Sequence, residues 1–176
     1  NPLGNWAMAF ASQLYIALPM ALINVIAFRN NPYYASVSYV YALPLAVMVF
    51  LWMNDMGAYC FGSLLQKYIP LKLFPSISPH KSWIGSVGGA MLTLASSLVF
   101  AHYFPVMPLP RWLGMAAVVV VFGTWGDLVE SQLKRTLGVK DSGKFLPGHG
   151  GALDRFDSSL LAIPCVVIYF YTLELM

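Results

Sequence analysis

Most of the ionisable side chains of this chain lie in one window, residues 126–157. The window holds five of the seven acidic residues: Asp127, Glu130, Asp141, Asp154 and Asp157. It also holds five of the ten lysines and arginines: Lys134, Arg135, Lys140, Lys144 and Arg155. Because the rest of the sequence is mostly apolar, we expect the chemistry of the protein to be concentrated in this window.

Two carboxylate pairs in the window share one spacing. Asp127 and Glu130 are three residues apart, and so are Asp154 and Asp157; on a helix such residues share a face. Carboxylates at the edge of hydrocarbon are costly unless they are paired or bind a cation. Oxygen ligands without cysteine favour Mg²⁺ or a similar hard cation over zinc. The pattern therefore predicts a metal site made by these four acids, with Asp55 as a fifth candidate.

Each acid pair also has a structural interpretation. Glu130 has the right spacing for an ion pair with Lys134 on the same helix. Asp154 or Asp157 could stabilise the start of the helix that follows, where the helix dipole favours negative charge. An ion pair of Glu130 leaves Asp127 unexplained, so the metal site is the preferred interpretation.

Between the acid pairs lies a loop with the composition of an anion-binding segment. Residues 140–144 read Lys-Asp-Ser-Gly-Lys, and residues 147–151 read Pro-Gly-His-Gly-Gly. Three glycines and a proline in five residues exclude a helix and favour a loop whose backbone N–H groups face an anion. With five cationic side chains around it, the loop is suited to several phosphates, although it is not a Walker loop. His149 could be a phosphate donor, an acid–base group or a packing residue.

Apolar helices must position these residues. The chain is 59% hydrophobic and 10% charged, whereas soluble domains are about 25% charged. An apolar run of about 20 residues crosses the hydrocarbon core of a membrane. We predict an all-α polytopic membrane protein with about five transmembrane helices, near residues 6–28, 36–59, 83–104, 112–126 (continuing to Asp127 and Glu130) and 158–176. Residues 66–82 should form a polar loop, and Gly85, Gly88 and Gly89 should allow close helix packing.

The distribution of cationic residues predicts the topology. The loops after the second and fourth predicted spans hold eight of the ten Lys and Arg residues, whereas the loops after the first and third hold only Arg29 and Arg111. The positive-inside rule places the eight-charge side, with the acids, in the cytoplasm. The net charge of +3 does not indicate nucleic-acid binding. Cys60 and Cys165 lack a second cysteine at ligand spacing and are expected to be structural thiols.

The beginning of the chain carries neither an initiator Met nor a basic signal region, so we expect N-terminal helices of a longer protein to be missing. We treat residues 1–176 as a single transmembrane catalytic region whose signature lies at 126–157.

The ordered motifs of the chain extend the signature to earlier residues. The main motif is Ser131-x-x-Lys134-Arg135-x-x-x-x-Lys140-Asp141, followed by His149-Gly-Gly-x-x-Asp154-Arg155-x-Asp157. Two shorter blocks are Asp55-x-x-Ala58-Tyr59-x-x-Gly62 and Ser78-Pro79-His80-Lys81-Ser82-Trp83-Ile84-Gly85. Together they resemble the signature of the phosphatidate cytidylyltransferases (CDP-diacylglycerol synthases), over roughly residues 55–158.

The resemblance implies a reaction in which the phosphate of phosphatidic acid attacks the α-phosphorus of CTP and displaces pyrophosphate, giving CDP-diacylglycerol. Such a transfer needs a divalent metal, cationic clamps and in-line positioning. The implied catalytic residues are Asp127, Asp154, Lys140, Asp141 and His149. The implied phosphate-binding residues are Lys81, Lys134, Arg135, Lys140, Lys144 and Arg155. The implied metal ligands are Asp127, Glu130, Asp154, Asp157 and Asp55, and Ser131 is expected to orient Asp127 or the helix end.

The expected cofactor is Mg²⁺ or another divalent cation, and a monovalent requirement stays open. The expected partners are CTP, phosphatidic acid and the lipid bilayer, without nucleic acid; a homodimer is plausible because glycine-bearing spans can pack across an interface. The expected location is the bacterial inner membrane, with the active site facing the cytoplasm. Two alternative functions remain: a CTP-dependent kinase of a polyprenol or other membrane alcohol, and a cation transporter.

Overall fold

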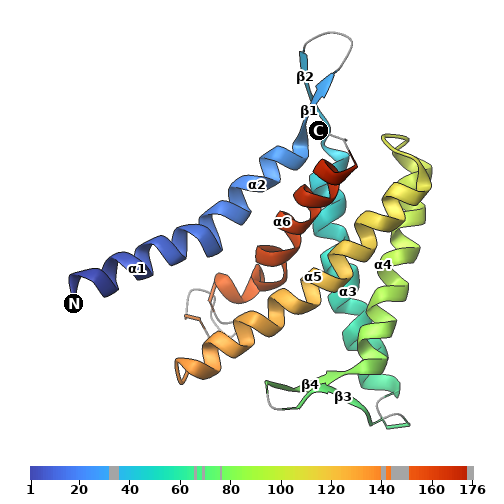
Figure 1. Cartoon of the computed structure of the whole chain (residues 1–176). Coiled ribbons are helices and arrows are strands. Elements are labelled where there is room, and N and C mark those ends of the chain that lie inside the picture. The colour runs from blue at the N-terminus through green and yellow to red at the C-terminus, as the bar shows by residue number, and fades with distance from the viewer. Residues whose placement is uncertain are drawn as a thin grey trace.

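The computed structural model describes residues 1–31, 36–65, 67–68, 70–75, 77–139, 142–143 and 151–173, and most of them are helical (Figure 1). The helices are α1 (Pro2–Ser12), the π-helical segment η1 (Gln13–Ala17), α2 (Leu18–Ala27), α3 (Ala42–Leu65), α4 (Trp83–Tyr103), α5 (Leu109–Thr136), the 3₁₀ turn η2 (Leu153–Arg155) and α6 (Asp157–Thr172). The strands are β1 (Phe28–Asn31), β2 (Ser36–Tyr39), β3 (Lys72–Phe74) and β4 (Ser78–Ser82).

The all-α polytopic membrane class is confirmed. Within the described ranges, four helical stretches are long and apolar enough to cross a membrane: Pro2–Ala27, Ala42–Leu65, Trp83–Tyr103 and Leu109–Thr136. The fifth predicted span, α6, is apolar but has 16 residues. A helix of that length covers only about 24 Å, so α6 is shorter than the other four.

Two short antiparallel hairpins were missed by the sequence analysis. Strands β1 and β2 pair in the register Phe28↔Tyr39, with these two rings 5.3 Å apart between centroids. Because β2 occupies the residues predicted to open the second span, that helix begins at Ala42 and not near residue 36. The second hairpin, β3–β4, lies within the loop predicted at residues 66–82.

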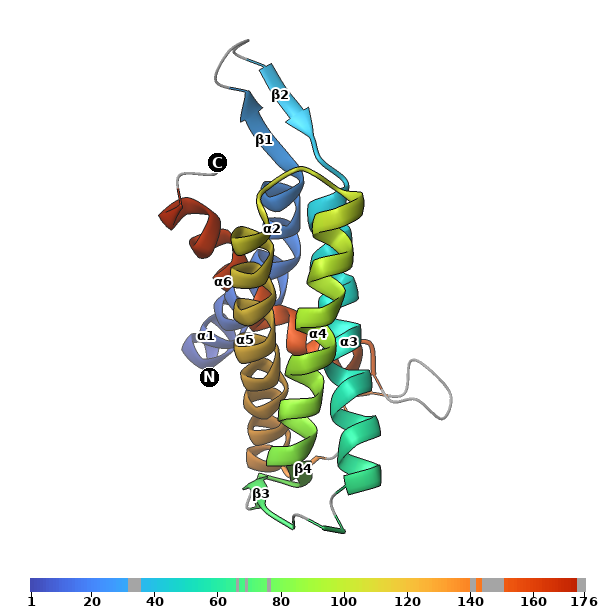
Figure 2. The same ribbon diagram turned by 90° about the vertical axis from the view of Figure 1, so that its right-hand side faces the viewer.

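The two hairpins lie at opposite ends of a helical bundle (Figures 1 and 2). Helices α3, α4 and α5 run side by side, and α6 packs against α5 and α2. The C-terminal ends of α3 and α5 lie near β3–β4, so the loops that follow them share one end of the bundle, as the topology prediction requires.

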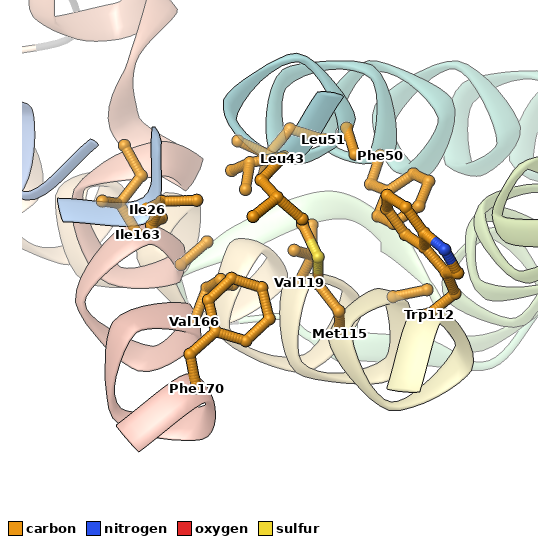
Figure 3. Packing of buried hydrophobic residues seen from close by; sticks show 14 of the residues in the cluster. Ile26, Leu43, Phe50, Leu51, Trp112, Met115, Val119, Ile163, Val166 and Phe170 are labelled. Carbon is orange, nitrogen blue, oxygen red and sulfur yellow. The ribbon is translucent and has the colours of Figure 1, made fainter. Parts of the chain in front are cut away.

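The hydrophobic core holds the helices together through the first half of α5 (Figure 3). Phe50 of α3 packs edge-on against Trp112 of α5, with ring centroids 6.3 Å apart, and Phe100 of α4 contacts both. On the other side of α5, Val166 and Phe170 of α6 are fully buried. Because the first half of α5 is buried in the core, it fixes the position of the polar second half of the helix.

Glycines allow two close helix contacts that position the acids. A methyl group at Gly89 of α4 would lie 2.5 Å from the carbonyl oxygen of Asn54 in α3, and one at Gly126 of α5 would lie 2.7 Å from the carbonyl oxygen of Asp157 in α6. Neither site has room for a side chain. The predicted close packing of the glycines near the start of α4 is confirmed, and it occurs within the subunit.

Pro19 lies near the start of α2, and the preceding turn is the π-helical segment η1. Proline has no N–H, so the carbonyl of Tyr15 loses its ordinary helical donor four residues on. Single π turns inside helices are frequent at functional sites. Here the irregular turn carries Tyr15.

Candidate active site

A polar cavity of about 340 Å³ lies near the β3–β4 end of the bundle. We call it the Asp127 pocket. It is formed by residues of α3, β4, α4 and α5: Asn54, Asp55, Ala58, Tyr59, Ser78, Lys81, Ser82, Gly85, Ser86, Thr124 and Asp127. Three of the predicted site residues, Asp55, Lys81 and Asp127, are thus brought together from segments far apart in the sequence.

Asp127 is held by one cation and one hydroxyl. Its Oδ2 atom forms an ion pair with the Lys81 ammonium, 2.5 Å away, and its Oδ1 atom accepts a hydrogen bond from Ser131 Oγ at 3.2 Å. Lys81 is placed by the start of α4, where the next residue, Ser82, accepts a hydrogen bond from the Gly85 N–H and acts as the helix N-cap. The predicted orienting role of Ser131 agrees with this geometry.

Asn54 is a pocket residue that the sequence analysis missed. Its side chain is buried, and its Nδ2 atom donates to Thr124 Oγ1 at 3.4 Å, whereas its Oδ1 atom has no hydrogen-bond partner among the described residues. Unpaired buried polar atoms are rare in native proteins. The available signal was a lone amide in an apolar run beside Asp55. Asp55 lies within electrostatic reach of Asp127 and Asp157.

A second charged group, the Lys134 cluster, comprises Glu130, Lys134, Ser142, Gly151 and Asp154. Lys134 Nζ lies 2.8 Å from Asp154 Oδ1 and 3.3 Å from Glu130 Oε1. The predicted ion pair of Glu130 with Lys134 is therefore confirmed, in addition to a bond across to Asp154. Glu130 is completely buried, and the 3.3 Å contact lacks hydrogen-bond geometry, so neither carboxylate oxygen accepts a hydrogen bond from the part of the chain that the structure describes.

Asp154 joins the two ends of the glycine-rich segment. Its Oδ2 atom accepts hydrogen bonds from Ser142 N at 3.0 Å, Ser142 Oγ at 2.9 Å and Gly151 N at 2.7 Å. Burial alone would raise the pKa of Asp154, but the Lys134 ammonium and these donors hold that pKa well below its usual value. Asp154 thus stays ionised and holds Ser142 and Gly151 close together.

Asp157 lies between the two charged groups. It is the first residue of α6, and its Oδ1 atom accepts a hydrogen bond from the Ser158 N–H at 2.6 Å, in keeping with the helix-start interpretation. It also interacts electrostatically with Asp127 and Lys134. Asp157 thus couples the Asp127 pocket electrostatically to the Lys134 cluster, and we call the two groups together the charged region.

The donor set of this region fits a hard divalent cation, but the present arrangement is not a finished metal site. Within the described ranges, no three acidic, histidine or cysteine side chains are grouped closely enough to hold an ion. Asp127 and Asp154 are engaged by lysines. The donors are nevertheless carboxylate and hydroxyl oxygens, as Mg²⁺ prefers, and Glu130 offers two oxygens that form no hydrogen bond with the described residues. Ligation would require the lysines to move.

Two further predicted residues, Arg135 and Arg155, are not among the residues that define the Asp127 pocket or the Lys134 cluster. Arg135 lines a separate pocket with Ile77, Gln132 and Thr136, and Arg155 is exposed in η2. Four predicted residues, Lys140, Asp141, Lys144 and His149, lie outside the described residues, so their roles stay predictions.

The comparisons with known proteins all indicate the same family. The model of the Cytidylyltransferase family matches residues 2–173. The phosphatidate cytidylyltransferase of Staphylococcus aureus (strain COL) is 44% identical over 126 residues, which cover 70% of this chain and 47% of the relative. The phosphatidate cytidylyltransferases of Staphylococcus haemolyticus and Staphylococcus saprophyticus are 44% and 45% identical over the same shares. The chain spans about half the length of the curated relatives it matches.

Proposed function

Because this chain belongs to the cytidylyltransferase family, we propose that it carries the site at which CMP is transferred from CTP to phosphatidic acid. A phosphate oxygen of the lipid attacks the α-phosphorus of CTP, and the bond from that phosphorus to the oxygen bridging to the β-phosphorus breaks. The products are CDP-diacylglycerol and pyrophosphate. The lipid phosphate is the nucleophile, so no nucleophilic side chain is required.

The observation that supports this proposal most directly is the pairing of lysine ammonium groups with carboxylates at one end of a membrane-spanning bundle. Lys81 and Lys134 are each paired with acids, Asp127 in one case and Glu130 with Asp154 in the other. A lysine ammonium on a flexible stem can exchange a carboxylate for a phosphate oxygen. Both lysines would then bind the triphosphate and the lipid phosphate and orient them for in-line transfer.

We propose that Asp127, Glu130 and Asp157 hold a divalent cation when the lysines shift, with Asp55 in support. Mg²⁺ would neutralise charge on the triphosphate and polarise the α-phosphoryl group. Asp154 would keep its contacts with Ser142 and Gly151 and so fix the phosphate-binding loop. Whether a monovalent cation is required stays open, and the homodimer stays a prediction.

We also propose that the charged region faces the cytoplasm of a bacterial cell. The support is the excess of Lys and Arg in the loops at the β3–β4 end, since such residues are retained on the cytoplasmic side. CTP, the proposed nucleotide substrate, would then reach the site from the aqueous side while the lipid arrives from the bilayer.

The function is tested with the purified protein in phosphatidylcholine nanodiscs containing phosphatidic acid, Mg²⁺ and CTP labelled at the α-phosphate. The expected result is label in the lipid fraction, lost on addition of EDTA. Lys81→Met should lower the rate about a hundredfold, whereas Lys67→Met, an exposed lysine outside both charged groups, should leave it within about twofold. Transfer of a γ-phosphate label instead would identify a kinase and overturn the proposal.

A further inference from the structure

Another cavity, almost wholly apolar, shares its Leu133 and Leu153 walls with the elements that carry Lys134 and Asp154. Its volume is about 480 Å³, and its walls come from α1, η1, one face of α5 and η2. We call it the α1–α5 cavity. Its main lining residues are Met8, Ala11, Tyr15, Val129, Leu133 and Leu153.

The cavity exists because α1 diverges from the rest of the bundle (Figure 1). None of the residues of α1 is buried, and its large apolar side chains Trp6 and Phe10 are 69% and 68% exposed. The helix is nevertheless part of the apolar helical stretch Pro2–Ala27, which is long enough to cross a membrane. The apolar walls of a wedge between two candidate membrane-spanning helices suit a hydrocarbon chain.

One end of the cavity is polar. The hydroxyl of Tyr15 is buried and has no hydrogen-bond partner among the described residues. It lies within electrostatic reach of Glu130, Asp157 and Lys134. A buried hydroxyl without a partner is destabilising, and the π-helical turn that carries Tyr15 is an irregularity typical of functional sites. The hydroxyl is thus available to a ligand that reaches the charged region.

We propose that the α1–α5 cavity holds an acyl chain of the phospholipid substrate, and that the Tyr15 hydroxyl donates a hydrogen bond to the lipid phosphate. The occupant is an anionic phospholipid because the cavity combines apolar walls with the Tyr15 hydroxyl, which lies within electrostatic reach of the Lys134 ammonium. This inference rests on the proposed function for the identity of the lipid. It makes Tyr15 a substrate-positioning residue that would hold the attacking phosphate beside Lys134.

The hydrogen bond is tested with Tyr15→Phe, which keeps the ring and removes only the hydroxyl. We expect KM for phosphatidic acid to rise about tenfold, while kcat and KM for CTP stay within about twofold. The matched control is Tyr169→Phe, which removes a hydroxyl bonded to the Arg111 carbonyl at 3.1 Å and should leave all three constants unchanged. An unchanged KM for phosphatidic acid in Tyr15→Phe would overturn the positioning role.

The chain-binding role is tested without turnover. Phosphatidic acid with a photoreactive diazirine on one acyl chain is added to the protein in phosphatidylcholine nanodiscs without CTP, and the cross-linked residues are mapped by mass spectrometry. We expect adducts on the cavity walls that unlabelled phosphatidic acid competes away. Ala11→Trp, which fills the cavity, should abolish them, whereas Ala9→Trp, on another face of α1 and absent from the cavity lining, should not.

Three results would overturn the chain-binding proposal. Adducts outside the cavity, or no adducts at all, would show that the acyl chain does not bind in the α1–α5 cavity. Equal labelling by photoreactive phosphatidylcholine would show a general lipid contact without headgroup recognition. Labelling that persists in Ala11→Trp would exclude the cavity. Specific cavity labelling without transfer of CMP would instead refute the proposed function alone, because the cross-link does not require turnover.

Discussion

The Asp127 pocket and the Lys134 cluster both pair lysine with carboxylate, but their surroundings differ. Lys81 and Asp127 keep 23% and 29% of their side-chain surface exposed and border an open cavity. Lys134 is only 18% exposed, and its partner Glu130 is fully buried. Asp154 has further donors from the loop backbone. The first pair can open to admit a ligand, whereas the second also maintains the structure.

The largest predicted effect separates the two groups by stability. Lys134→Met would leave the buried Glu130 carboxylate without its cation, and breaking a buried ion pair costs about 3 kcal/mol. Lys81→Met breaks a partly exposed pair and should cost about 1 kcal/mol or less. Thermal unfolding in detergent measures both. Equal losses of stability would contradict the distinction, and Glu130→Gln combined with Lys134→Met should recover much of the loss.

An intermediate effect is predicted at the contact that joins the two groups. Gly126→Ala places a methyl group 2.7 Å from the Asp157 carbonyl oxygen, so α5 and α6 must move apart. We expect a loss of about 2 kcal/mol in unfolding free energy and an activity about tenfold lower, because such a shift misplaces the reacting groups. Gly4→Ala, which has ample room, is the control. Unchanged activity in Gly126→Ala would show that the spacing of the helices is not critical.

The smallest predicted effect is a dependence of the protein's stability on pH that is confined to acidic pH. The hydrogen bonds and the Lys134 ammonium lower the folded-state pKa of Asp154 below its unfolded value, which is about 3.9. A lowered folded-state pKa stabilises the protein above the unfolded pKa, and this stability is lost as the pH falls toward the folded-state pKa. The contribution of Asp154 to the melting temperature should therefore be constant from neutral pH to about pH 5. Asp154→Asn should flatten the decline below pH 4, and an equally steep decline in that variant would contradict the assignment.

The sequence predicted those features that local spacing determines. The membrane class followed from the apolar runs, and the contact of Lys134 with Glu130 followed from their spacing of four residues. The β1–β2 hairpin was missed because Val37 and Tyr39 suit an apolar helix as well as a strand.

Contacts between helices were harder to predict. The hydrogen bond from Asn54 to Thr124 and the position of Tyr15 depend on how α1, α3 and α5 pack, which no local pattern encodes. Asp154 was predicted as a metal ligand, and its bonds to Ser142 and Gly151 were not foreseen because they depend on how the loop folds back.

The most direct test of the proposed transfer site is the initial rate at which α-labelled CTP labels phosphatidic acid in Asp127→Asn compared with the unaltered protein. The substitution keeps the shape of the side chain and removes the charge that pairs with Lys81. We predict a rate about a thousandfold lower, with no larger loss of stability than in Lys81→Met. A rate within about threefold of the unaltered protein would show that the Asp127 pocket is not the site of CMP transfer.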